Sequence, residues 1–421
     1  MAVHFIHTSD WHLGQLFYHY SRHYEHTQFL TWLIQQIQEK QPNALLIAGD
    51  IFDVINPSSS AQKQLYQFLA EAHRVAPHMQ TLMIAGNHDS GYRIEQIEPL
   101  LEKYNAKTVG LVRWHDDHTL DTDRLILPIY DQAKQIVAWC VALPFLRHAE
   151  ITGFNEHTTD RQSAIEYLHQ TLIEEAKLRK TADQALIVMS HAHMQGGLES
   201  ESERSIIIGH QEALSTDLFG DDVDYVALGH LHRPQKVGAD HVRYSGSPIP
   251  LSLSEKDYKH QCVEAWIDFK QSTPFRFQPL YVPRSVDMCR LNGELSDVMD
   301  EIKALPTDKI EATEQREYLD IEYYSFTPPP LNLRQQIEAA LPPSRYRLLR
   351  IFRQVVQTES DTQDSSKIDL APPTPVQLFD QLWKKMGYLP DESVKQDFLT
   401  LLHEAEALKQ DDQSPSDEGF V

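Results

Sequence analysis

Five short segments of the chain carry oxygen and imidazole side chains of the types that bind catalytic metals. They contribute seven candidate ligands, which are Asp10, His12, Asp50, Asn87, His191, His230 and His232. Oxygen and imidazole nitrogen without thiolate suit Mn²⁺, Fe or Zn²⁺ at a catalytic site better than a structural zinc. Each segment alone contains residue pairs that are common in turns, but the ordered set of five is hard to obtain by chance. The set predicts a two-metal centre of the kind that hydrolyses phosphate esters.

Predicted strands and helices alternate between these segments. Continuous apolar runs, typical of strands covered on both faces of a sheet, lie at residues 44–48, 81–85, 136–142 and 186–189. Apolar side chains recur at helical spacing through residues 29–37 and 65–72, the second stretch after a helix-starting serine cluster at 58–60. This alternation predicts a layered α/β domain. Ligands of such sheets gather at the carboxyl ends of strands, so we expect the motifs to meet in one crevice.

Length and composition limit the class of protein. The 421 residues predict two to three domains, and no run of about 18 apolar residues is present, which excludes a transmembrane helix. The chain starts with a strand-like run at 3–8, and no secretory signal is visible. Cys140 and Cys262 lie in apolar runs and Cys289 is separate, which favours free thiols in a reducing cytoplasm.

The net charge of −23 argues against a protein that coats DNA, which would carry a basic stripe. A nuclease is not excluded, because a bound metal pair adds about +4 charges locally and inverts the field at the site. We therefore expect that the grip on a nucleic acid comes mostly from a partner.

The rest of the chain divides into smaller parts. The predicted organisation is a metal-binding domain at 1–275, an α/β domain at 276–356, a flexible linker at 357–373, docking helices at 374–410 and an acidic disordered tail at 411–421. The α/β domain is expected to contain strands at 286–291, 317–324 and 346–356 and helices at 294–305 and 331–341. Thr374 and Pro375 make a helix start.

Two apolar stripes follow that start. The first contains Leu378, Phe379, Leu382, Trp383 and Met386, and the second contains Val394, Phe398, Leu401, Leu402, Ala405 and Leu408. One interpretation is a helical hairpin packed on its own domain. The alternative, which we favour because a tethered hairpin has little chain to bury its aromatic residues against, is a surface that docks on a partner helix or coiled coil.

The motifs, together with the stretches at 225–234 and 242–251, resemble the calcineurin-like metallophosphoesterase family, and within it the SbcD nuclease subfamily. This resemblance covers roughly the first 270 residues. It implies a layered α/β fold with a capping domain that shapes the DNA entrance, and a cytoplasmic homodimer. It also implies 3′→5′ exonuclease action on duplex DNA and opening of hairpins, in DNA repair, recombination and replication. The implied partner is the SbcC ATPase, docked on the C-terminal helices, and the implied cofactors are two Mn²⁺ ions, with Mg²⁺ as the alternative.

The same resemblance distributes the ligands over two metals. It assigns Asp10, His12, Asp50 and His232 to one metal, and Asp50, Asn87, His191 and His230 to the other. Asp50 is the predicted bridge. His88 matches the family position that protonates the leaving oxygen or steadies the phosphate, a task suited to imidazole near neutral pH. Asp53 is expected to orient His88 or a ligand, and its alternative is a helix cap.

Several side chains near the motifs have structural interpretations that compete with functional ones. Asp89 is expected to stabilise a turn. His19, His23 and His26 are expected on a loop and a solvated helix face, and His115 to His118 on a surface turn rather than in an accessory metal site. Arg233, Arg243 and Ser247 are candidates for phosphate contact or for structural roles.

Two other functions compete with the nuclease. A small-molecule or cyclic-nucleotide phosphodiesterase would use the same ligands, but it would not require a second domain and docking helices. A non-catalytic assembly scaffold would not require an intact ligand set together with His88.

Overall fold

The chain is described here from a computed structural model covering residues 2–116, 119–147, 161–203, 213–307, 312–342, 345–355 and 374–411, without the side chains of 406–411. It divides into two compact units, Met1–Asp287 and Met288–Val421. No described helix is long and apolar enough to cross a membrane.

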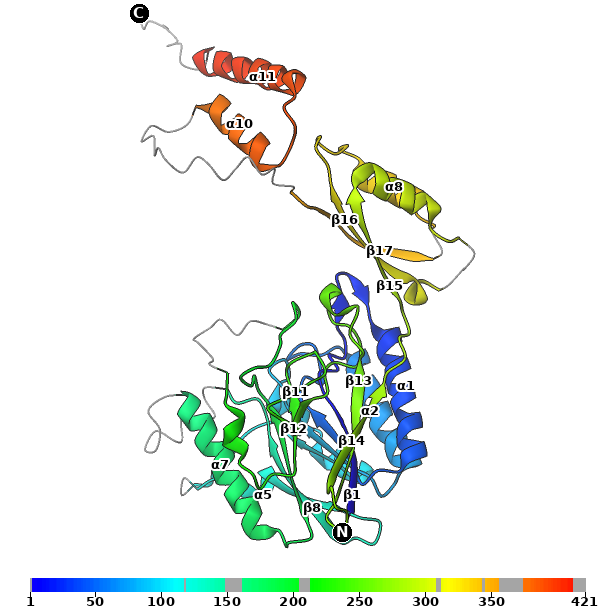
Figure 1. Cartoon of the computed structure of the whole chain (residues 1–421), viewed down its shortest axis with the longest axis vertical. Helices are drawn as coiled ribbons and strands as arrows, with labels where there is room; N and C mark the ends of the chain where they lie inside the picture. The colour runs from blue at the N-terminus through cyan, green and yellow to red at the C-terminus, as the bar shows by residue number, and fades with distance from the viewer. Residues whose placement is uncertain are drawn as a thin grey trace, which may run out of the picture. The chain divides into compact units, whose positions relative to one another are not determined.

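The first unit contains two six-stranded sheets (Figure 1). The first sheet has the order β14-β13-β1-β4-β5-β6. Its members are β1 (Ala2–Thr8), β4 (Ala44–Ala48), β5 (Gln80–Ile84), β6 (Ala106–Val109), β13 (Gln261–Asp268) and β14 (Phe275–Tyr281). Strands β1, β4, β5 and β6 run parallel, whereas β13 is antiparallel to both of its neighbours. The carboxyl ends of three consecutive strands of the predicted alternation therefore meet at one edge.

The second sheet has the order β11-β12-β10-β9-β8-β7. Its members are β7 (Ile126–Tyr130), β8 (Ile136–Leu143), β9 (Ala185–His191), β10 (Tyr225–Gly229), β11 (Gln235–Val237) and β12 (Ala239–Tyr244). Its four inner strands are parallel and its two edge strands are antiparallel to their neighbours. Strands β9 and β10 thus end side by side, which places their last residues together.

Three long helices cover the sheets. Helices α1 (His23–Lys40) and α2 (Ser59–Val75) bury their apolar faces with Ile6, Leu45 and other first-sheet side chains in one core cluster. A second cluster joins the opposite face of that sheet to the second sheet and to α7 (Arg161–Arg179). Figure 1 shows α7 and the α1–α2 pair on opposite sides of the sheets. The layers are therefore helix, sheet, sheet and helix.

Short elements complete this unit. They are the hairpin β2 (Leu16–Phe17) and β3 (Tyr20–Ser21), helices α3 (Gly91–Glu95), α4 (Glu98–Leu101) and α5 (Thr122–Leu125), and the 3-10 turns η1 (Glu102–Tyr104), η3 (Thr216–Phe219) and η4 (Leu253–Glu255).

The structure confirms the predicted β-α-β-α-β alternation, and the apolar run at 44–48 is completely buried as a strand covered on both faces should be. Ser58 caps α2 through a hydrogen bond from the backbone amide of Ala61 at 3.2 Å. The second sheet and the antiparallel edge strands were not predicted. One expectation was wrong: His26 is fully buried, because its side of α1 packs inward beside Arg22 and Trp11.

The second unit begins with a three-stranded parallel sheet, β15 (Met288–Glu294), β16 (Glu317–Tyr324) and β17 (Tyr346–Arg353), in that order. Helices α8 (Leu295–Ala304) and α9 (Leu333–Ala340) pack on it around Val298, Ile302 and Ile337. The turn η5 (Thr313–Gln315) precedes β16. These elements lie within a few residues of their predicted ranges.

Helices α10 (Pro375–Lys385) and α11 (Glu392–Asp411) follow. Thr374 caps α10 with a full capping box to Gln377, and Pro375 occupies the first turn, as predicted. The predicted linker at 357–373 lies outside the described residues, and so does the predicted tail beyond 411.

Candidate metal centre

The candidate ligands gather where strands of both sheets end. Asp10 and His12 follow β1, Asp50 follows β4, and Asn87 follows β5. His191 is the last residue of β9, and the pair His230 and His232 follows β10. The two sheets therefore bring seven side chains, separated by more than two hundred residues, into one place.

The atoms that would bind a metal lie close to one another. Three groups have all their ligand atoms within 4.8 Å: Asp10 with His12 and His232, His12 with Asp50 and His88, and Asp10 with Asp50 and His191. All of these side chains are buried. Interlocking groups of this kind fit more than one cation.

Asp50 occupies the middle of the cluster. Its Oδ2 lies 3.6 Å from Nε2 of His12 and 3.4 Å from Nε2 of His191. Its Oδ1 accepts a hydrogen bond from the backbone amide of His88 at 2.8 Å. One carboxylate oxygen thus faces a histidine from each half of the cluster, which is the arrangement that a bridging carboxylate requires.

Asn87 lies between His191 and His230. Its side-chain oxygen lies 2.9 Å from Nε2 of His191 and 3.2 Å from Nδ1 of His230. His230 in turn donates its backbone amide to Oδ1 of Asp10 at 3.0 Å. The structure therefore brings together every candidate ligand taken from the sequence.

Backbone strain is concentrated in the same place. Asp10, His12 and Asp50 have φ angles of 54°, 48° and 48°, and His230 has a φ of 110°. Non-glycine residues rarely adopt positive φ, and such conformations persist where the surrounding structure imposes them, commonly at functional sites. Four of the seven candidate ligands share this feature, so the fold holds them in place at an energetic cost.

Two glycines allow the strands to approach. A Cβ atom on Gly49 would lie 2.2 Å from Nδ1 of His191, and one on Gly86 would lie 2.2 Å from Oδ1 of Asp50. Any larger residue at either position would displace a candidate ligand.

Asp53 contacts both His88 and the candidate ligand His12. Nδ1 of His88 donates to the backbone carbonyl oxygen of Asp53 at 2.7 Å, whereas the Asp53 carboxylate lies 3.2 Å from Nδ1 of His12. Asp53 thus contacts both side chains, one through its backbone and one through its carboxylate. Asp89 accepts hydrogen bonds from the backbone amides of Ile51, Phe52 and Gly86, which is the structural role expected for it.

The buried charges shift one another's pKa values. Burial disfavours the charged form of Asp50, but the nearby His191 and other imidazoles hold the pKa of Asp50 well below its ordinary value. Burial also disfavours charged His191, yet the charge of Asp50 outweighs this and raises the pKa of His191 to about 9. Burial raises the pKa of Asp10. Because ligands bind metal in their deprotonated forms, metal uptake at this cluster would release protons.

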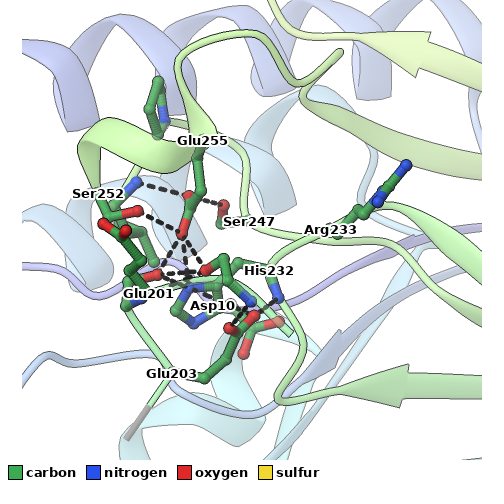
Figure 2. Close-up of polar contacts among 12 residues, drawn as sticks. Asp10, Glu201, Glu203, His232, Arg233, Ser247, Ser252 and Glu255 are labelled. Carbon is green, nitrogen blue, oxygen red and sulfur yellow. Dashed lines mark hydrogen bonds and ion pairs between the residues drawn. The ribbon is translucent and has the colours of Figure 1, made fainter. Parts of the chain in front are cut away.

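A ring of polar groups around His232 was not predicted. Nδ1 of His232 donates to Glu255 at 3.1 Å, and the backbone amide of His232 donates to Glu203 at 2.7 Å (Figure 2). Ser202 also contacts the imidazole of His232, with its Oγ 2.6 Å from Nδ1. The one local signal, serine at 252 and glutamate at 255, is the spacing of a capping box, so it would indicate a helix start rather than a contact with a ligand.

The remaining candidates lie away from the cluster or support it indirectly. Arg243 stacks on Phe277 at 3.8 Å, and the buried Ser247 hydroxyl donates to Glu255 at 3.4 Å, so both have structural contacts. Arg233 is exposed near the Tyr258 ring. His115 is exposed beside Asp121, and His118 lies outside the described residues.

The donor set fits divalent metal ions. Buried Nε2 of His12 has no hydrogen-bond partner among the described residues and points toward Asp50. A buried polar nitrogen without a partner is unfavourable, and a metal bond would satisfy it. Oxygen and imidazole ligands without thiolate suit Mn²⁺, Mg²⁺ and Zn²⁺ to different degrees, so the cluster by itself does not select the ion.

Comparisons with known proteins agree with this chemistry. The family model for calcineurin-like phosphoesterases matches residues 3–234. A second model, SbcD_C, described as the type 5 capsule protein repressor C-terminal domain, matches residues 284–387.

Similar proteins from three bacteria carry one name, the SbcD subunit of the nuclease SbcCD. The chain is 39% identical to that of Rhodobacter capsulatus over 304 residues, which are 71% of this chain and 74% of that protein. It is 32% identical to the SbcD protein of Escherichia coli K12, over 71% of this chain and 73% of that protein. It is 30% identical to the SbcD protein of Bacillus subtilis, over 60% of this chain and 63% of that protein.

Proposed function

Because the chain belongs to the calcineurin-like phosphoesterases, and within them to the SbcD nuclease subunits, we propose that it is a metal-dependent nuclease subunit that hydrolyses phosphodiester bonds in DNA at this cluster. The observation that carries the proposal is the convergence of all seven predicted ligands in one site, with Asp50 between the two halves. A scaffold without catalysis would not require this arrangement or its strained backbone.

The proposed ligand sets follow the two halves of the cluster. Asp10, His12, Asp50 and His232 would hold one ion, and Asp50, Asn87, His191 and His230 would hold the other. Two divalent ions held by these residues would supply a nucleophilic hydroxide and would neutralise charge on the phosphoryl oxygens. Mn²⁺ is the proposed ion, with Mg²⁺ as the alternative.

The protein's own residues orient the ligands and move a proton. Nδ1 of His12 is held by Asp53 and Nδ1 of His191 by the Ala48 carbonyl oxygen at 2.8 Å, so Nε2 of each ring faces the cluster. Nδ1 of His88 is held in the same way by the Asp53 carbonyl oxygen. We propose that Nε2 of His88 protonates the leaving oxygen or steadies the phosphate. Its ring also lies within ligand distance of Asp50 and His12, so its role needs a direct test.

The finer activities are proposals that rest on the family. They are 3′→5′ exonuclease action on duplex DNA and endonucleolytic opening of hairpins in DNA repair, recombination and replication. A chromosomal DNA substrate would place this activity in the bacterial cytoplasm. The acidic net charge of −23 supports a partner that supplies most of the grip on DNA.

The second unit is proposed to cap the DNA entrance through its three-stranded sheet, and to bind an SbcC-type ATPase through α10 and α11. The exposed side chains of α10, including Leu378 at 46% and Leu382 at 52%, support the docking part of this proposal. The homodimer implied by the family stays a prediction, which analytical ultracentrifugation would test.

The decisive experiment combines metal counting with nuclease assays. The purified chain would be titrated with Mn²⁺ and with Mg²⁺, and then assayed on blunt and hairpin DNA with and without the ATPase partner. We expect two ions per chain and Mn²⁺-dependent cleavage, extended to hairpins by the partner and ATP. Two bound ions with hydrolysis of cyclic nucleotides but not of DNA would favour the phosphodiesterase alternative. Two ions without any hydrolysis would favour the scaffold.

A further inference from the structure

A buried carboxylate lies behind one proposed metal ligand. Glu255, at the end of η4, has no exposed surface. Its Oε1 accepts the hydrogen bond from Nδ1 of His232 at 3.1 Å, and Figure 2 shows its carboxylate directed at that ring. Because Nδ1 donates to Glu255, Nε2 remains as the nitrogen that can bind a metal.

The other contacts of Glu255 are hydrogen bonds from neutral groups. The backbone amide of Leu251 donates to Oε2 at 2.8 Å, and the hydroxyls of Ser200 and Ser202 donate to Oε1. Hydrogen bonds from the protein therefore replace the ones that the carboxylate would form with water, as a buried charge requires.

Glu255 has no permanently charged ion-pair partner among the described residues. Within the described part of the chain, its ion-pair partner is His232. Buried Glu25 instead pairs with Arg22, and buried Asp320 pairs with Arg290 and Arg350. Those partners carry permanent charges, and none of them belongs to the cluster. The charge of Glu255 is directed at an imidazole that the proposed chemistry uses.

The histidines of the cluster differ in what holds their outer nitrogen. His191 donates to a backbone carbonyl oxygen, and His12 lies against Asp53, whose side chain is 26% exposed. His232 has the fully buried carboxylate. A buried acceptor holds the ring more strongly and makes its other nitrogen a better ligand, because water does not weaken the interaction.

We propose that Glu255 is a positioning residue for the metal position formed by Asp10, His12 and His232. It fixes the tautomer and the orientation of His232, so that Nε2 points at that ion. The inference rests on the two-metal function proposed above, and it predicts an effect on one metal position rather than on both.

The test compares two buried glutamates that each pair with a histidine. Glu255→Gln keeps the shape and removes the charge. Glu264→Gln is the control, because Glu264 is 2% exposed and pairs with His4 at 2.9 Å, and none of its ion-pair partners, His4 and Lys40, belongs to the cluster. Calorimetric titration of the full chain with Mn²⁺ should resolve two binding events in the wild type. Glu255→Gln should weaken one of them by about 10–100-fold and leave the other unchanged, whereas Glu264→Gln should change neither.

A double variant separates positioning from general stability. In a His232→Ala background, adding Glu255→Gln should cause no further loss of Mn²⁺ affinity if Glu255 acts through His232. A wild type that binds fewer than two ions would refute the proposed function itself. A wild type with two ions and a Glu255→Gln variant with unchanged affinities would refute only this inference.

Folding failure would also be informative. Loss of both ions together with a lower melting temperature in Glu255→Gln would make Glu255 a structural residue and overturn the proposal. Ser202→Ala provides a milder variant, because it removes one donor to Glu255, together with the hydroxyl beside Nδ1 of His232, and leaves the carboxylate in place. It should weaken the same single binding event, by a smaller factor, without lowering the melting temperature. Equal weakening of both events would contradict the assignment.

Discussion

The metal cluster of the first unit and the helices α10 and α11 of the second unit are built in opposite ways. Six of the seven proposed ligands expose 6% of their surface or less, and each is held by contacts with residues distant in sequence. None of the side chains of α10 is buried, and its start is specified by the neighbouring Thr374 and Gln377. The proposed metal ligands are thus buried and held by long-range contacts, whereas the proposed partner surface lies on exposed side chains of a helix.

The C-terminal helices also show which side chains remain for a partner. Phe379 stacks on Phe398 with ring centroids 4.3 Å apart, and Trp383 stacks on Phe379 at 5.4 Å. These aromatic residues therefore join α10 to α11, so the little chain available to the hairpin does provide contacts for them. Leu378, Leu382 and Leu401 are exposed instead. A docking test should change the exposed leucines first.

The largest effect is expected at the shared carboxylate. Asp50→Ala should reduce bound metal below two ions per chain and abolish DNA cleavage, because Asp50 faces both halves of the cluster. Metal analysis and a nuclease assay measure the two effects, with the exposed Asp240→Ala as the control. Two bound ions and full turnover in the variant would exclude Asp50 as the bridge.

A smaller loss, confined to turnover, is expected at His88. If its imidazole acts on the leaving group, His88→Ala should lower the rate of cleavage by about 10²–10⁴-fold while metal content is retained. The measurement is single-turnover cleavage on metal-saturated protein. Loss of one ion in this variant would make His88 a ligand, in agreement with its closeness to Asp50 and His12.

In the second unit, changes on α10 should separate binding of the ATPase from cleavage of DNA. Leu378→Asp with Leu382→Asp should abolish co-purification with the SbcC-type ATPase and leave cleavage of simple DNA ends unchanged, because charges on an exposed stripe oppose burial in an interface. Phe379→Asp with Trp383→Asp should have the same effect on docking and should also loosen the α10–α11 pair, visible as lost helical circular dichroism. Undiminished co-purification of the leucine variant would place the docking surface elsewhere.

The smallest predicted effect concerns acid stability. Burial lowers the pKa of His7 to about 3 and that of His169 to about 4, so both are neutral in the folded first unit. The unfolded chain takes up these protons below about pH 6.5, whereas the folded unit does not until lower pH. The contribution of these two histidines to stability is therefore complete above about pH 6.5 and falls as the pH drops toward 4, by about 1.4 kcal/mol per pH unit for each group.

Hydrogen exchange at pH 7 and pH 5 would measure this in each unit of the intact chain. The first unit should lose protection and the second should not, because residues 288–421 contain one histidine, His403, which is exposed. His169→Gln should reduce the loss in the first unit, and the exposed His115→Gln should leave it unchanged. Equal loss in both units would show that other groups control acid stability.

By itself, the sequence determined the elements that depend on neighbouring residues and the identity of the ligands. The apolar runs of β4 and β9, the helical spacing of α1 and α2 and the cap at Thr374 are local patterns, and the structure follows them. The seven candidate ligands could be selected because metal-binding side chains after strands form a recognisable ordered set. The sequence could identify Asp89 as structural because one of its contacts, with the backbone amide of Gly86, lies within its own turn, whereas its contacts with Ile51 and Phe52 depend on the tertiary structure.

Tertiary structure alone decided what depends on long-range packing. The division into two sheets, the burial of His26 and the pairing of Phe379 with Phe398 all arise from contacts between segments that no local pattern connects. Glu255 is the clearest case, because its spacing from Ser252 indicates a helix cap, whereas packing directs its carboxylate at His232. The sequence gives the type of each side chain, but long-range packing of the chain decides which residue that side chain contacts.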